Sequence, residues 1–155
     1  MARRDRPALT LDADGHRALA RQLNAAVWDG LASDRDPARD AELVDLAHAS
    51  LHHWRAAAGT AELVRGEWLV SRVYAVNHRP EPARYHAHRA YELCVAQQLG
   101  GFDLAYAYEG MARALAVGGD DYAEWHARAV AAGESIEDPE DAAIFAADLD
   151  APPWS

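Results

Sequence analysis

The sequence predicts an all-α protein of about seven helices that pack as antiparallel pairs. Apolar residues recur with a helical period, helix start and stop signals return at short intervals, and no segment shows the alternation of a strand. Consecutive helices with short connections must lie antiparallel, so the connections predict the pairing. The expected helices span residues 14–32, 37–58, 61–77, 81–98, 102–117, 122–135 and 139–149, with ends placed to within about 2–4 residues.

Capping residues mark several of these helix ends. Asp36 and Asp138 each precede a proline suited to the first helical position, where a missing N–H has no consequence, and both are expected to be N-caps. Gly59 is expected to close one helix with a positive φ, and the hydroxyl of Thr60 is expected to cap the next. Helix ends and starts spaced this closely are typical of helical hairpins.

Length bounds the domain organisation. A chain of 155 residues is long enough for one self-sufficient domain without disulfides or metal. We expect this domain to occupy residues 14–149. A loosely held N-terminal tail at 1–13, which holds the only cluster of arginines, and a C-terminal tail at 150–155 complete the prediction.

Charge and hydropathy exclude several classes of function. The formal net charge of −10 and the pI near 5.1 argue against a nucleic-acid-binding surface, which requires clustered arginine and lysine. No apolar run approaches the length of a membrane span, and no apolar segment follows the N-terminal arginines as in a signal peptide. We therefore expect a cytoplasmic protein that does not bind a membrane. The single cysteine, Cys94, is predicted to be a small core residue.

A sequence pattern that occurs twice relates the helix pairs. The segment 71–76 ends a helix in an aromatic and small residues, and the next helix carries a stripe of small residues, Ala83, Ala87 and Ala90. The segment 111–117 and the helix after it repeat this arrangement. Aligning Tyr74 with Leu115 gives a period of 41 (115 − 74), longer than the roughly 34 residues of a tetratricopeptide repeat. The pattern predicts a short, degenerate, tetratricopeptide-like stack of helix pairs.

Several short strings carry a more specific resemblance. They are Ala47-His48-Ala49-Ser50, His53-Trp54, Ser71-Arg72-Val73-Tyr74-Ala75-Val76, Pro82-Ala83, His86-Ala87, and Phe102-Asp103-Leu104-Ala105 through Tyr108-Glu109. With them the chain resembles a group of short, largely uncharacterised bacterial tetratricopeptide-like proteins, over residues of about 21–149. The resemblance implies a fold but no reaction.

Arg72 is the most informative charged residue. It lies in a helix that is apolar almost all the way round, so its guanidinium requires a carboxylate partner unless it reaches solvent. Glu109, on the flank of the apolar face of the fifth helix, is the expected partner, and Asp103 is the second choice. Glu109 also has an i,i+4 neighbour in Arg113, and the two pairings of Glu109 carry equal weight.

The chain has eight histidines, which raises the question of a metal site. His48 and His52 have the i,i+4 spacing that binds a metal from one helix face, but this pair alone lacks a third ligand. His86 shares a face with small residues and should point inward, either as a core histidine with satisfied nitrogens or as a ligand. We expect His53 to face the same interior region as His86. The metal hypothesis therefore uses His48, His53, His86 and Glu109 with zinc or another divalent ion.

Two functions follow from these observations. No nucleophile elbow, phosphate loop, dinucleotide fingerprint or zinc-protease helix occurs, so the leading hypothesis is a helical-repeat module, without a cofactor, that binds a peptide or protein segment in a groove. The alternative is a small metalloprotein or enzyme whose inward polar cluster contains His53, Arg72, Tyr74, His86, Tyr108 and Glu109. Convergence of these side chains on one cavity would favour the alternative. Catalysis and homo-oligomer formation both stay open.

Overall fold

The computed structural model describes residues 10–57 and 59–154, which form seven α-helices and no strand. The helices are α1 (Ala13–Leu31), α2 (Pro37–Ala57), α3 (Thr60–Val76), α4 (Pro80–Ala96), α5 (Gly101–Val117), α6 (Ala123–Gly133) and α7 (Pro139–Asp150). The all-α prediction is confirmed, and the described ends lie within two residues of those expected. None of the described helices combines the length and the apolar character needed to cross a membrane.

Both predicted aspartate caps are present. The Oδ1 atom of Asp36 accepts the backbone N–H of Arg39 at 2.8 Å at the start of α2. Asp138 accepts from the backbone N–H groups of Glu140 and Asp141 at 2.9 and 3.0 Å at the start of α7. Each carboxylate thus satisfies N–H groups that have no partner within their own helix.

The predicted cap of α3 is wrong. Gly59 has φ −80° and ψ 178°, so it is extended and serves as the N-cap itself, without a side-chain hydrogen bond. Thr60 is already the first helical residue. Because the extended glycine begins the helix one residue earlier than expected, the threonine hydroxyl lies past the capping position.

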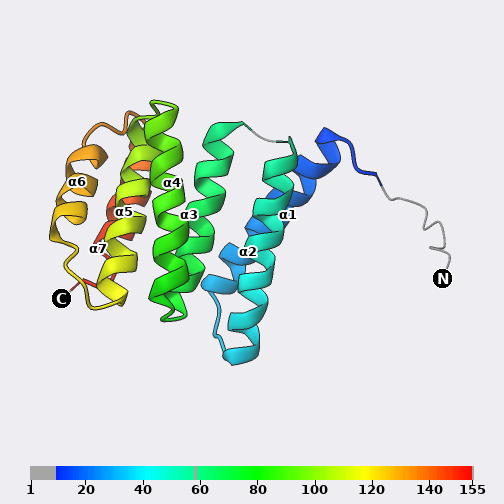
Figure 1. Cartoon of the computed structure of the whole chain (residues 1–155), viewed down its shortest axis with the longest axis horizontal. Coiled ribbons are helices and arrows are strands. Elements are labelled where there is room, and N and C mark those ends of the chain that lie inside the picture. Colours follow the sequence, from blue (N-terminus) through cyan, green and yellow to red (C-terminus); the bar gives the residue numbers. More distant parts are fainter. Residues whose placement is uncertain (1–9, 58, 155) are drawn as a thin grey trace.

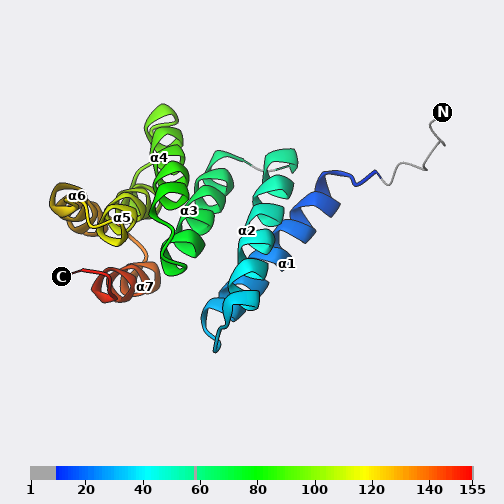
Figure 2. The same ribbon diagram turned by 60° about the horizontal axis from the view of Figure 1, so that its bottom comes forward.

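Each helix packs against the next along the chain, as Figure 1 shows from α1 at one end to α6 at the other. In addition, α3 packs on α5 and α5 packs on α7, so the odd-numbered helices are neighbours. A ring contact of 5.7 Å between Trp28 and Trp68 joins α1 to α3 in the same row. Helix α7 lies beside α5 and α6, set apart from the row of α3 to α6 in Figure 2.

Small residues allow the central helices to approach closely. Ala83, Ala87, Ala90 and Cys94 of α4 are fully buried, which confirms Cys94 as a core residue. Burial, with a smaller effect of the negative charge of Asp103, raises the pKa of the Cys94 thiol to about 12. The stripe therefore serves packing of α4 against its neighbours.

The chain termini depart in part from the predicted tails. Helix α1 begins at Ala13, inside the predicted N-terminal tail, and residues 1–9 of that tail lie outside the described residues. At the other end α7 continues to Asp150. Trp154 then folds back, with its Nε1 donating to the carbonyl of Leu149 and its ring 5.0 Å from the Arg113 guanidinium. The described part of the C-terminal tail is thus packed on the domain.

Candidate functional site

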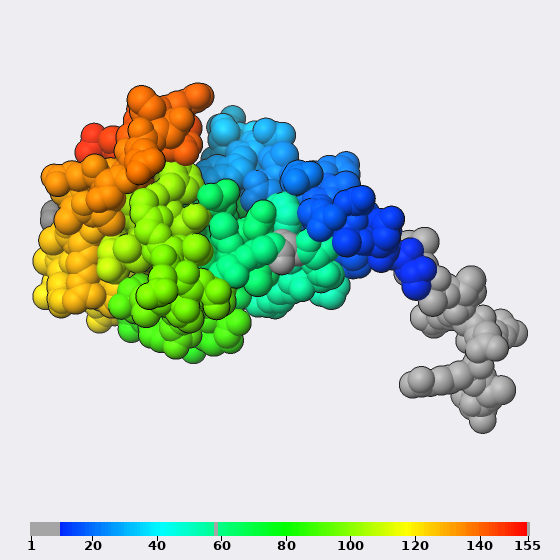
Figure 3. Space-filling view, turned by 90° about the horizontal axis from the view of Figure 1, so that it is seen from above, coloured from blue at the N-terminus to red at the C-terminus, as the bar shows by residue number. Residues whose placement is uncertain are grey.

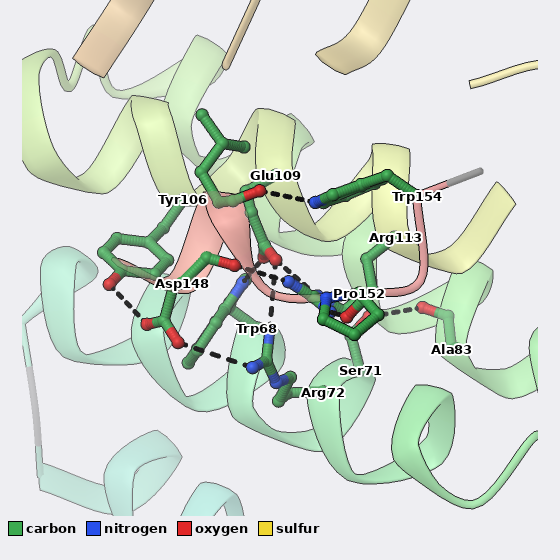
Figure 4. A network of polar contacts seen from close by, with 11 residues as sticks. Trp68, Ser71, Arg72, Ala83, Tyr106, Glu109, Arg113, Asp148, Pro152 and Trp154 are labelled. Carbon is green, nitrogen blue, oxygen red and sulfur yellow. Dashed lines mark hydrogen bonds and ion pairs between the residues drawn. The ribbon is translucent and has the colours of Figure 1, made fainter. Parts of the chain in front are cut away.

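A network of charged side chains lies where α3, α5 and α7 meet (Figure 4). Arg72, with 13% of its side chain exposed, places one guanidinium nitrogen 3.2 Å from Glu109 Oε1 and the other 3.4 Å from Asp148 Oδ1. The prediction of a largely buried Arg72 paired with Glu109 is confirmed. Asp103, the second choice, binds Arg65 instead, with 2.7 Å between Oδ1 and Nε.

Glu109 is fully buried and accepts from three donors. These are Trp68 Nε1 at 2.9 Å, the Arg72 guanidinium and Arg113 Nε. Both pairings weighed for Glu109 therefore exist together, because Arg72 and Arg113 approach the same oxygen from different helices. The donors satisfy a carboxylate that would otherwise be strongly destabilising in the interior.

The same network holds α7 and the C-terminal segment in place. Arg113 donates to the carbonyl of Asp148 at 2.9 Å and to the carbonyl of Pro152. The Tyr106 hydroxyl donates to Asp148 Oδ2 at 2.7 Å, and burial together with this bond raises the pKa of the phenol. In Figure 4 these side chains point toward one another from three helices.

A cavity of about 430 Å³ opens beside the network, among α1, α3, α5 and α7. Most of its lining is apolar or aromatic, with Trp28 from α1, Trp68 from α3, Phe102 and Tyr106 from α5, and Ile144 from α7. In the space-filling view the N-terminal helices and the C-terminal segment flank the middle of the molecule (Figure 3). The volume and the apolar character are those of a ligand site.

The aromatic rings of the cavity pack in a continuous series. Trp28 stacks on Trp68 with centroids 5.7 Å apart, Trp68 meets the edge of Tyr106 at 4.8 Å, and Tyr106 contacts Phe102 at 4.7 Å. Trp28 is 39% exposed and Ile144 is 50% exposed at its rim. Large apolar side chains that stay exposed around a cavity are typical of a binding surface.

Two shallower hollows extend this cavity along α1 and α3. One is lined by Arg21 and shares Asn24 and Arg65 with the cavity; the other is lined by Arg35 and shares Trp28. We call the cavity and the two hollows together the groove. It is apolar at its centre. Arg21 and Glu62 line one end, and Arg35, whose Nε lies 3.1 Å from Asp40 Oδ1, lines the other.

A second polar cluster lies between α2, α3 and α4. The Nδ1 atom of His86 is 2.7 Å from Glu67 Oε2, and Glu67 Oε1 accepts from Arg55 at 2.8 Å and Arg89 at 3.1 Å. Burial raises the pKa of the Glu67 carboxyl, but the hydrogen bonds from His86, Arg55 and Arg89 outweigh it and lower this pKa to about 2. Since the carboxylate is ionised, His86 Nδ1 carries the proton that it donates.

His48 and Tyr74 complete this second cluster. The Nε2 atom of His48 is 2.9 Å from the Tyr74 hydroxyl, and its ring centroid is 5.1 Å from that of His86. His86 stacks on Tyr74 with centroids 5.9 Å apart. Burial lowers the pKa of His48, and the nearby His86 lowers it further. The inward position of His86 is confirmed.

The prediction that His53 shares this region with His86 is wrong. His53 Nδ1 is 2.8 Å from His16 Nδ1, so its ring faces α1 rather than α3 and α4. His48 and His53 lie on opposite flanks of α2, and the flank that faces α4 belongs to His48. Burial lowers the pKa of His53, with smaller contributions from His16 and His52.

Tyr108 also lies apart from the residues with which it was grouped. Its ring is 5.9 Å from Tyr91 and 6.0 Å from Trp125, in an aromatic contact among α4, α5 and α6. The six residues of the predicted polar cluster therefore divide among four places. Tyr74 and His86 stay together, Arg72 and Glu109 stay together, and His53 and Tyr108 each lie elsewhere.

The predicted metal set is likewise divided. His48 and His86 are neighbours, but His53 faces α1, and Glu109 is satisfied by Trp68 and two arginines. Within residues 10–57 and 59–154, no three His, Cys, Asp or Glu side chains are placed to hold a metal ion. These four residues therefore do not form one metal site. Their positions on the helix faces did not indicate which neighbouring helix each side chain meets.

Three residues of these clusters and of the groove are not marked by the sequence pattern. Glu67 stands beside Trp68 in the helix whose apolar character singled out Arg72, so the same argument applied to it. Asp148 belongs to a short terminal helix, and nothing in its local pattern marks it as a partner of Arg72. Trp28 of α1 lines the groove only because it stacks on Trp68 of α3, a contact that the sequence of α1 does not indicate.

Comparison with protein-family models gave no match, and neither the curated proteins nor the solved structures gave one.

Proposed function

We propose that this protein binds a peptide or protein segment in the groove. The observation that carries the proposal is the cavity of about 430 Å³ built by aromatic and aliphatic side chains from α1, α3, α5 and α7. Its wall is preorganised, since Trp68 is held by Glu109 and Asp148 of α7 is held by Arg72 and Tyr106. A rigid apolar groove between helices is a common mode of peptide recognition. The tetratricopeptide-like pairing of helices belongs to the same proposal.

Two features favour binding over chemistry at this site. The acids that line the cavity, Asp103 and Asp148, are each paired with an arginine, so neither is a free base. The exposed Trp28 and Ile144 offer apolar contact area at the rim, where an apolar side chain of a bound peptide would bury it.

The proposal is tested by selecting twelve-residue random peptides displayed on phage against the purified protein. We expect enriched sequences that carry an apolar or aromatic anchor. Synthetic copies labelled with fluorescein should bind the protein and lose about tenfold or more in affinity with Trp28→Ala, because a hot-spot aromatic contributes at least about 1–2 kcal/mol.

Tyr85→Ala is the matched control, because Tyr85 is also an exposed aromatic side chain, 60% accessible, and lies on α4 away from the groove. It should leave the affinity unchanged. Circular dichroism and melting curves establish that both variants are folded. No enrichment, or equal binding to the Trp28 variant, refutes the proposal.

A further inference from the structure

We propose that His16 of α1 and His53 of α2 bind a divalent transition-metal ion between the two helices, with Cu²⁺ as the preferred ion and water as the remaining ligands. The site is separate from the groove, and it does not depend on the proposed peptide binding. Three observations support it: the close approach of two imidazole nitrogens, the fixed distance between their helices, and the access of solvent to both rings.

The two imidazoles direct the same ring nitrogen at each other. Their Nδ1 atoms lie 2.8 Å apart, and their ring centroids lie 5.0 Å apart. An ion bound to both nitrogens at about 2.0–2.1 Å would then have a ligand angle of roughly 84–89°. This is close to the right angle between neighbouring ligands of a square-planar or octahedral ion. A turn of each ring about χ2, which is a soft torsion in histidine, aims both lone pairs at the ion.

Hydrogen bonds on either side of the pair fix the distance between its helices, which lie side by side (Figure 1). One turn further along α1, Ala20 is fully buried, and its carbonyl accepts from Ser50 Oγ of α2 at 2.9 Å. On the other side of the pair, the Arg17 guanidinium donates to the carbonyl of Ala57 at 2.8 Å. The imidazoles are therefore held opposite each other by contacts in which neither ring takes part, and the site is preorganised.

The pair can release its Nδ1 atoms to a metal without losing a proton. In the metal-free pair, one Nδ1–H donates to the lone pair of the other Nδ1. Metal binding needs both lone pairs, so the proton leaves Nδ1 and a proton from solvent binds Nε2 of the same ring. Both side chains are partly exposed, and the described residues offer no hydrogen bond to either Nε2. The exchange of tautomers therefore breaks no other contact.

Two protein ligands suit copper better than zinc. Zinc sites in proteins use three or four side-chain ligands, and within the described ranges no third His, Cys, Asp or Glu joins this pair. His52 contacts the edge of the His53 ring, with centroids 5.4 Å apart, but it is exposed and lies outside the pair. Cu²⁺ accepts a tetragonal set of nitrogen and oxygen ligands, and it binds such ligands more tightly than Ni²⁺ or Zn²⁺ does.

A metal at this position would join α1 to α2. An ion that binds only the folded chain stabilises it by mass action. With free Cu²⁺ at about a hundred times its Kd, we expect the Tm to rise by about 5–10 °C. The net charge of −10 favours the approach of a cation.

The test titrates Cu²⁺ into the full-length protein without a histidine tag, in a buffer that does not bind copper, and follows binding by calorimetry. We expect a tightest site that holds one Cu²⁺ per chain. His16→Gln and His53→Gln should each weaken this site by about tenfold or more, since even the outer partners of metal ligands contribute that much. Both variants should also lose most of the rise in Tm.

Electron paramagnetic resonance of the wild-type complex gives a readout that needs no variant. The spectrum should be that of a tetragonal Cu²⁺ ion with two nitrogen ligands.

His88→Gln is the matched control, because His88 is also a helical histidine, with 54% of its side chain exposed, and lies on α4. This substitution should leave the tightest site and the rise in Tm unchanged. Circular dichroism without metal should give the same helix content for all three variants.

Four results would overturn the proposal. Equal affinity of the wild type and both pair variants would place the copper elsewhere, and tighter binding of Zn²⁺ than of Cu²⁺ would contradict a site with two protein ligands. A spectrum with fewer than two nitrogen ligands would show that the ion does not join the two rings. A wild-type Tm that copper does not raise would show that the ion does not stabilise the pair of helices.

Discussion

Two buried glutamates, Glu67 and Glu109, organise the polar interior residue by residue. Each is at most 1% exposed, and each accepts from three donors on other residues. They differ in their surroundings. The donors of Glu67 include two exposed arginines, whereas Arg113, which binds Glu109, is itself only 4% exposed. Substitutions in the two clusters should therefore change the free energy of unfolding by different amounts.

The lowered pKa of Glu67 predicts that its contribution to the free energy of unfolding depends on pH in the acid range. Its pKa falls from the ordinary value of 4.5 to about 2 in the folded state, so the folded chain binds its proton less tightly than the unfolded chain. The contribution is complete above about pH 4.5 and is lost as the pH falls toward 2. Urea unfolding of wild type and Glu67→Gln should differ by about 2–3 kcal/mol at pH 7, with a smaller difference at pH 3.

The matched control is Glu62→Gln, an acid in the first turn of the same helix. Its effect on the free energy of unfolding should be small at both pH values. A Glu67 effect that stays constant between pH 7 and pH 3 would contradict the assigned pKa.

In the Glu109 cluster, Arg113 should matter more than Arg72. Removing Arg72 leaves Glu109 with Trp68 and Arg113, and Asp148 keeps Tyr106, so Arg72→Ala should destabilise by about 1–3 kcal/mol. Removing Arg113 withdraws donors from Glu109 and from two backbone carbonyls, so Arg113→Ala should destabilise by about 3–5 kcal/mol. Denaturant unfolding curves of the two variants measure the order, and a larger loss for Arg72→Ala would contradict it.

At the scale of elements, the contact between α3 and α5 depends on one glycine. A Cβ atom added at Gly110 would lie 2.9 Å from Cδ1 of Trp68, whose ring forms the floor of the groove. Helices that approach this closely have no room for even a methyl group without moving a neighbour. The indole cannot yield easily, because Glu109 holds its nitrogen.

Gly110→Ala should therefore destabilise the fold by about 1–3 kcal/mol and shift the tryptophan fluorescence as Trp68 is displaced. Gly100→Ala is the control, since nothing lies within 4 Å of a Cβ built there and its φ of −123° suits any residue. Thermal melts and emission spectra of the two variants compare the effects. If Gly110→Ala were as stable as the wild type, α3 and α5 could move apart to accept the methyl group without a loss of stability, which would contradict the prediction.

At the scale of the whole molecule, Cys94 reports on unfolding. It is fully buried at the centre, and burial raises its thiol pKa to about 12, so it is both inaccessible and protonated in the folded state. Labelling by a disulfide reagent at pH 8 should be slower in the native protein than in urea by roughly a thousandfold or more, because it requires large-scale opening. Rapid labelling of the native chain would show that α4 opens locally.

The groove is also a property of the whole molecule. Four helices far apart in the sequence contribute to it, and the contacts of Asp148 with Arg72 and Tyr106 are among those that hold α7 there. The pairing of consecutive helices does not by itself create such a site. The return of α7 to the odd-numbered row closes one side of the cavity.

The sequence by itself determined the helices and their order. Helical periodicity and capping residues are local properties, so the seven helices, the caps at Asp36 and Asp138, and the burial of Cys94 were predictable. The pairing of Arg72 with Glu109 was predictable as well, since a charge in an apolar helix requires a nearby opposite charge.

Only the tertiary structure decided which residues meet across helices. The periodicity places His48 and His53 on opposite flanks of α2, but packing determines that His48 meets His86 while His53 meets His16. For the same reason the sequence did not reveal Asp148 as a partner of Arg72, or the groove itself. A helix pattern fixes the angle of a side chain about its own axis, whereas the neighbour that it meets depends on how the other helices pack around it.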